Sequence, residues 1–129
     1  MTDTRAMLDT GGGDASPERA AAIDALLDCA QTCQTCAMAM VQSGGMAAEV
    51  RRAMDCGDLC EAAERILSRG PDPEPRVVAA AVEAARVACE ASAAACGAHA
   101  DHHPHCRLHS KSAQARAEAL GALQKSTSG

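Results

Sequence analysis

The stretch Cys29-Ala-Gln-Thr-Cys33-Gln-Thr-Cys36-Ala-Met-Ala-Met40 decides how this chain folds. Its cysteines are spaced by four and then three residues, and Met40 continues the row four residues later. At about 100° per residue, these four side chains lie within roughly 60° of one another on a helix. Such a face predicts either a row of soft metal ligands or a buried seam, because cysteine and methionine are also common core residues.

The composition favours helices throughout. The chain contains no Phe, Tyr or Trp, and alanine is abundant. Alanine is the best helix former, whereas the β-branched and aromatic residues that favour strands are scarce. The 129 residues suffice for one core. We therefore predict one all-α domain whose helices pack closely around a thin core.

Capping and breaking residues divide the chain into four long helices. Residues 16–18 (Ser-Pro-Glu) form a helix start, and the glycine pair 44–45 forms a helix end. The alternating prolines of 71–75 and Pro104 interrupt the helical pattern. We predict helices over 16–43, 46–69, 76–102 and 104–124, with flexible tails at 1–15 and 125–129. Short connections then favour an up-down-up-down four-helix bundle with inward-facing cysteines.

Helix rise places the cysteines at matching depths in such a bundle. At about 1.5 Å per residue, the cysteines form layers that descend from one bundle end. The predicted layers, from the deepest upward, are Cys29, Cys60 and Cys89, then Cys33 and Cys56, then Cys36 and Cys96. Nearer the end come Met40, His99, Cys106 and His109, with Met46 and His103 at the rim. Cysteines that only fill volume need not share depths, so the layers favour a metal-binding core.

The histidines gather at the same end of the predicted bundle. The chain has five: His99, His102, His103, His105 and His109. One hypothesis is that they capture metal and pass it to the thiols. The alternative is a polar loop whose histidines only face solvent.

The donor set predicts which metal would bind. Clustered thiolates supported by thioether favour Cu(I), with zinc and iron–sulfur centres as competitors. A structural zinc site usually needs only two ligand pairs, whereas these ligands form a ladder suited to several ions. The predicted ligands are Cys29, Cys33, Cys36, Cys56, Cys60, Cys89, Cys96, Cys106, Met40, His99, His103 and His109.

These motifs resemble a known family over roughly residues 22–116. The matching features are Cys29-x3-Cys33-x2-Cys36-Ala37, Cys56-x3-Cys60, Cys89-x6-Cys96-x2-His99 and His103-x-His105-Cys106. They resemble the cysteine-rich four-helix-bundle copper storage proteins of bacteria. The resemblance implies Cu(I) ions on inward-facing cysteines, His and Met near one open end, and a homo-oligomer, commonly a tetramer. Forms without a signal peptide are cytosolic.

The sequence departs from that family's pattern at several positions. Thiols are expected but absent at Ala63, Ser92, His109, Ala113 and Arg116. The last helix has therefore lost almost its whole row of thiols. The histidine at 109 suggests a mixed Cys/His site near Cys106, which zinc or copper could use.

Charge and hydropathy indicate where the protein is located in the cell and which kinds of partner are not expected to bind it. The net charge of −5 without a basic patch argues against nucleic acid. No apolar signal region occurs in 1–14, and no run of about 18 apolar residues could span a membrane. We expect a cytoplasmic protein with reduced thiols. Its partners would be copper ions and proteins that deliver or accept copper.

Other functions compete with metal sequestration. Cys33-x-x-Cys36 could form a redox-active disulfide, although the pair lies in mid-helix. A zinc or iron–sulfur bundle and a purely structural bundle with cysteine as core filler also stay open. No nucleophile elbow or Glu-x-x-His pair is present, so we expect no enzyme.

Overall fold

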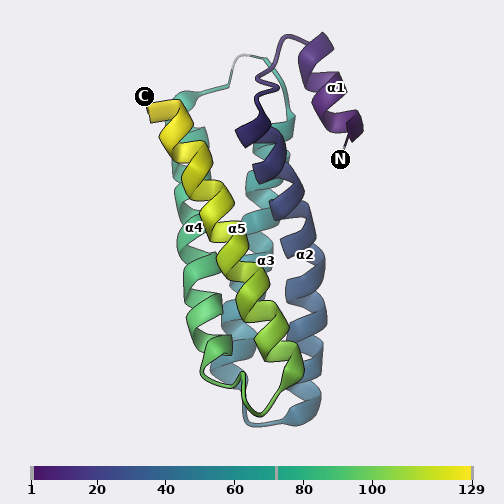
Figure 1. Ribbon diagram of the computed structural model, residues 1–129, viewed down its shortest axis with the longest axis vertical. Helices are drawn as coiled ribbons and strands as arrows, with labels where there is room; N and C mark the ends of the chain where they lie inside the picture. The colour runs from purple at the N-terminus through teal and green to yellow at the C-terminus, as the bar shows by residue number, and fades with distance from the viewer. Residues whose placement is uncertain (1, 72, 129) are drawn as a thin grey trace.

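The structure is a computed structural model that describes residues 2–71 and 73–128. Four long helices lie side by side, and a short helix lies at one end of them (Figure 1). Their bounds are α1 Thr2–Thr10, α2 Pro17–Ser43, α3 Ala47–Ser68, α4 Pro75–Gly97 and α5 Pro104–Ser128. No strand occurs in the described ranges. The prediction of an all-α fold is confirmed.

Consecutive long helices run in opposite directions because short connections join them (Figure 1). Helix α2 packs against α3 and α5, and α4 packs against the same two helices. All four long helices therefore surround one interior. We call the end that holds residues 44–46 and 98–103 the mouth, and the end that holds α1 and the α3–α4 connection the closed end.

Local signals explain the helix ends, with one difference from prediction. The Ser16 hydroxyl accepts a hydrogen bond from the Arg19 backbone N–H at 3.2 Å, and Gly44 ends α2 with a φ of 77°. Helix α4 was predicted to reach residue 102 but ends at Gly97. The chain turns there through hydrogen bonds between residues three apart, such as His99 N–H to the Cys96 carbonyl at 3.0 Å. Such turns bring the chain to Pro104, before which helical geometry is disfavoured.

The structure has helical residues in both segments for which tails were predicted. Residues 2–10 form α1, whose Leu8 is buried in the closed-end core, and the Gly13 N–H closes the helix on the Leu8 carbonyl at 2.8 Å. A single buried leucine is too weak a pattern to predict a helix from sequence. At the other terminus, α5 continues through Ser128, past the predicted end at residue 124, and the Ser126 and Thr127 hydroxyls donate to the Leu123 carbonyl in this last turn.

The interior changes character along the long axis. Toward the closed end it consists of aliphatic side chains: Leu8, Ile23, Leu26, Leu67, Val82, Leu120 and Leu123. Toward the mouth it is lined by cysteine and methionine, including Cys36, Met40, Met46, Cys96 and Cys106. Within the described part of the chain, no helix is long and apolar enough to cross a membrane.

Candidate metal centre

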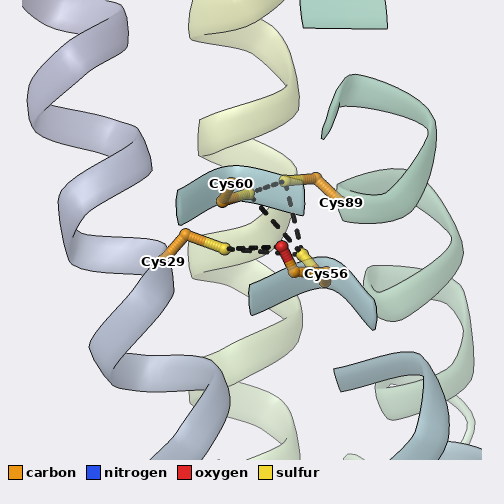
Figure 2. Close-up of side chains that lie close together, drawn as sticks. All are labelled: Cys29, Cys56, Cys60 and Cys89. Carbon is orange, nitrogen blue, oxygen red and sulfur yellow. Dashed lines mark hydrogen bonds between the residues drawn. The ribbon is translucent and has the colours of Figure 1, made fainter. Parts of the chain in front are cut away.

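Four cysteines from three helices meet in the middle of the interior (Figure 2). We call Cys29 of α2, Cys56 and Cys60 of α3, and Cys89 of α4 the tetrad. All four are fully buried. The Sγ atom of Cys56 lies 3.4 Å from that of Cys29 and 3.6 Å from that of Cys89. Cys60 Sγ lies 3.5 Å from Cys89 Sγ, so the sulfurs face one another across a single point in the core.

The tetrad has the spacing that a metal ion requires. A tetrahedral ion with metal–sulfur bonds of about 2.3 Å needs sulfur–sulfur separations of about 3.8 Å. Four of the six sulfur–sulfur separations in the tetrad run from 3.4 Å to 4.0 Å, and all six are within 4.8 Å. All eight cysteines are free thiols, so every tetrad sulfur is available as a ligand.

The predicted layers need one correction. Cys29, Cys60 and Cys89 do meet, as the depth arithmetic predicted, but Cys56 also joins their set while it keeps its predicted contact with Cys33. Cys33 Sγ lies 3.4 Å from Cys29 Sγ, on the mouth side. Residues four apart share a helix face, and the Cys56 and Cys60 sulfurs approach to 4.0 Å. The predicted depths used only the rise of the backbone, so they did not include how far the side chains of Cys56 and Cys60 extend toward each other.

Gly57 allows α2 and α3 to approach at this level. It is buried, and a Cβ atom there would lie 3.2 Å from the Cβ atom of Cys33. This role was not predicted, although Gly57 directly follows a predicted ligand in mid-helix, which is a recognisable signal. The missing side chain keeps the cysteines of the two helices within reach of one another.

Hydrogen bonds among the thiols raise the pKa values of some cysteines and lower those of others. Bonds from Cys29, then Cys56 and Cys60, lower the pKa of Cys89, and the charge of Arg116 adds to this. The pKa of Cys29 is raised, first by its hydrogen bond with Cys33, then by the other thiols and by burial. A thiolate at Cys89 is thus stabilised by neighbouring S–H groups. Hydrogen bonds from Cys29 and then Cys56 also lower the pKa of Cys33, so the thiolate form is favoured at that neighbouring cysteine too.

Two further ligand sets lie between the tetrad and the mouth, and they share Cys36. One consists of Cys36, Cys96 and His109, and the other of Cys36, His105 and Cys106; the ligand atoms within each set lie within 4.8 Å of one another. A hydrogen bond from Cys96 lowers the pKa of Cys36. Burial, followed by the charge of Cys96, raises the pKa of Cys106 to about 11. Each of these two sets therefore combines two sulfur atoms with one imidazole nitrogen. The buried thioether of Met40 packs in the same core cluster.

His109 is held by a second polar side chain. Its Nε2 atom lies 2.7 Å from Ser92 Oγ and 4.0 Å from Cys33 Sγ. Its Nδ1 atom is buried and has no hydrogen-bond partner among the described residues. With Nε2–H donating to Ser92, Nδ1 keeps a lone pair inside the core. A ligating imidazole is usually oriented by such a hydrogen bond on its other nitrogen.

The remaining histidines occupy the mouth. His99 Nε2 lies 3.1 Å from Glu49 Oε1, and the His103 ring lies 6.2 Å from the His99 ring and 5.4 Å from the His105 ring. His99 and His103 therefore lie outside the three ligand sets, although both were predicted ligands. His105 was left out of the predicted set, yet it stands with Cys36 and Cys106, and its buried Nε2 atom has no partner among the described residues. Its position directly before Cys106 was the signal that could have included it.

Comparison with known proteins gives consistent matches. The family model described as copper storage protein matches residues 15–124. The chain is similar to the copper storage protein Ccsp from Streptomyces lividans loaded with 10 copper equivalents, with 30% identity, a TM-score of 0.84, and 93% of this chain and 96% of that chain covered. It is also similar to a cytosolic copper storage protein from Streptomyces lividans with five coppers, with 31% identity, a TM-score of 0.78, and coverage of 82% and 91%. A search of curated proteins finds no match.

Proposed function

The chain belongs to the copper storage protein family, and from this premise we propose that it stores copper as Cu(I) on the thiolates of its interior. The observation that carries the proposal is the tetrad, in which four buried sulfurs approach to between 3.4 Å and 4.0 Å. Thiolates are soft ligands that select Cu(I). Two or three thiolates satisfy Cu(I), so four sulfurs can hold several ions bridged by shared ligands.

A path of donors supports uptake from the mouth. His99 and His103 stand at the surface, His105 and Cys106 follow, and Cys36 belongs to both inner sets. Beyond them, His109 reaches Cys33, and Cys33 reaches Cys29 of the tetrad. We propose that copper moves along this path by exchange of ligands. The proposed ligands are Cys29, Cys33, Cys36, Cys56, Cys60, Cys89, Cys96, Cys106, Met40, His99, His103, His105 and His109.

The up-down-up-down four-helix bundle of α2–α5 is the proposed storage unit. Its aliphatic closed end has no donors for copper among the residues of that core cluster that lie beyond the tetrad. Storage therefore fills the half of the bundle nearer the mouth. A related protein is described as loaded with 10 copper equivalents, whereas this chain has eight cysteines and lacks most of the α5 row. We propose a smaller capacity here.

The same proposal covers the setting of the protein. We propose a cytoplasmic storage protein without catalytic activity, since one relative is described as cytosolic. We further propose a homo-oligomer, a tetramer by family resemblance, which exchanges copper with delivery and acceptor proteins. Sedimentation of the apo and loaded protein would measure the assembly directly.

Anaerobic Cu(I) titration against a tight colorimetric Cu(I) chelator tests the storage function. The reduced protein should withhold several equivalents of Cu(I) from the chelator. Cys29→Ser combined with Cys60→Ser should lower that number, because two of the four tetrad sulfurs are lost. A protein that withholds one equivalent or none would contradict storage. A preference for Zn(II) in competition would assign the thiols to zinc instead.

A further inference from the structure

A cation, Arg116, lies in the core near the tetrad, at a position where the family resemblance predicted a thiol. Arg116 lies on α5 in the inward-facing row that includes Cys106, His109 and Ala113. Its relative exposure is 2%, although arginine is among the residues least often buried. A buried guanidinium in a bundle this small requires a physical reason.

One nitrogen of Arg116 is fixed to the helix turn that carries two of the cysteines. Its Nη1 atom donates to Thr32 Oγ1 at 2.8 Å, Ser112 Oγ at 2.8 Å and Asp28 Oδ2 at 3.2 Å. Thr32 and Asp28 directly precede Cys33 and Cys29 in the sequence. The guanidinium is therefore anchored at the level where α2 presents its sulfurs to the tetrad.

The other two nitrogens have no such partners. The Nε and Nη2 atoms are buried and make no hydrogen bond to any residue that the structure describes. The carboxylate of Asp28 is 58% exposed, whereas the Arg116 side chain is 3% exposed. Solvent screens an exposed carboxylate, so this ion pair offsets only part of the cost of removing a guanidinium from water. Asp28 alone therefore leaves the positive charge of Arg116 incompletely compensated, and the neighbouring thiolates are the remaining source of negative charge.

We propose that Arg116 is the built-in counter-charge of the copper–thiolate cluster on the tetrad, an inference that rests on the proposed storage function. Each thiol that binds releases a proton, and each Cu(I) brings one positive charge. A cluster with fewer copper ions than thiolates is therefore anionic. Arg116 offsets one excess negative charge, and its two unpartnered N–H groups can donate to cluster sulfurs.

Electrostatics within the core agree with this role. Burial lowers the pKa of Arg116, but attraction to Cys29, Cys33, Cys89 and Cys56 outweighs it, and the pKa is raised. The guanidinium thus lies where the thiolate forms of three tetrad cysteines, and of their neighbour Cys33, attract it. The Arg116 charge should favour partly filled, anionic clusters over filled, neutral ones. The consequence is a tetrad that holds its first copper ions tightly and its last ions weakly.

Three variants test this inference. Arg116→Met removes the charge at similar volume, Arg116→Lys keeps the charge without the planar fork, and Asp28→Asn removes the ion-pair partner as the control. For each, chelator competition measures Cu(I) affinity, and thermal melting measures the stability of the apo and loaded protein. We expect Arg116→Met to weaken binding of the first Cu(I) ions at least tenfold while the apo melting temperature stays equal or rises. Arg116→Lys should retain part of the affinity, and Asp28→Asn should retain or increase it.

The outcomes separate this inference from the storage function. If wild type binds several Cu(I) ions and Arg116→Met binds them equally well, the counter-charge role is wrong and storage stands. If wild type binds none, storage itself is wrong. A lower apo melting temperature with unchanged affinity would make Arg116 a purely structural residue. Should Arg116→Met fail to fold, Asp28→Asn decides, because a structural ion pair predicts lower affinity and stability, and a counter-charge predicts neither.

Discussion

The tetrad and the mouth both carry potential copper ligands, but they hold these ligands in different ways. The tetrad is all sulfur and fully buried, and its sulfurs are already at metal-binding separations (Figure 2). The mouth mixes sulfur with imidazole nitrogen; its half-buried histidines His99 and His103 lie ring to ring, and His99 also pairs with Glu49. In the tetrad, backbone packing holds the ligands. At the mouth, His99 and His103 lie outside the three ligand sets, so these two side chains must move before they can close around an ion.

This difference separates affinity from rate. A buried set of preorganised thiolates loses little conformational freedom on binding, so it should dominate the equilibrium. A partly exposed set with loosely arranged nitrogen donors can accept and release an ion quickly, so it should dominate the kinetics. Variants of the tetrad and of the mouth should therefore affect different measurements.

The largest expected effect is loss of the tetrad. Ligands that bind only the folded state stabilise it, by about 2.7 kcal/mol per site at a free concentration of one hundred times Kd. We expect copper loading to raise the melting temperature of the wild type by well over ten degrees. Cys29→Ser with Cys60→Ser should abolish most of that rise, measured by anaerobic thermal melting at saturating Cu(I).

The matched control is Cys106→Ser, which removes a mouth thiol of the same chemistry. It should leave most of the copper-linked rise intact, because the tetrad remains whole. Equal losses in the two variants would remove the distinction between the tetrad and the mouth. No rise in the wild type would make the cysteines core filler.

A smaller effect is expected for the mouth, and in rate only. His105 stands with Cys36 and Cys106 between the surface histidines and the interior. His105→Ala should slow Cu(I) uptake about tenfold, as expected if an exchange step loses roughly 1.4 kcal/mol of stabilisation, while the number of ions bound changes little. Stopped-flow mixing with a Cu(I) donor measures the rate.

His102→Ala provides the comparison for this rate. His102 is also at the mouth, but it is exposed and belongs to none of the three ligand sets. Its replacement should leave uptake unchanged. If both variants slow uptake equally, a general charge effect of the loop explains the histidines. If His105→Ala lowers capacity as much as loss of the tetrad does, His105 belongs to the store.

The sequence predicted the tetrad better than it predicted the mouth, for a physical reason. Helix periodicity and a fixed rise per residue determine where Cys29, Cys60 and Cys89 lie, because those residues are in mid-helix. His99 and His103 lie in the turns after α4, where no repeat fixes side-chain direction. Arg116 and Ser92 were noticed only as missing thiols, since the partners that explain a buried polar residue come from other helices. Helix α1 was missed because, among those of its side chains that the structure describes, Leu8 alone is deeply buried.

The smallest expected effect is a shift in the pH dependence of uptake. Burial, followed by the charges of His103 and His109, lowers the pKa of His105 below its ordinary value of 6.5. Imidazole binds metal only when neutral, so His105 stays competent below pH 6.5, where an exposed histidine is already half protonated. The sign follows for stability as well: the unfolded chain binds the proton more readily, so this group destabilises the apo fold as pH falls below 6.5. Uptake by the wild type should therefore decline with a midpoint below pH 6.5, and His105→Ala should lose that decline. A midpoint at or above 6.5 would mean that the exposed histidines, and not His105, control passage into the core.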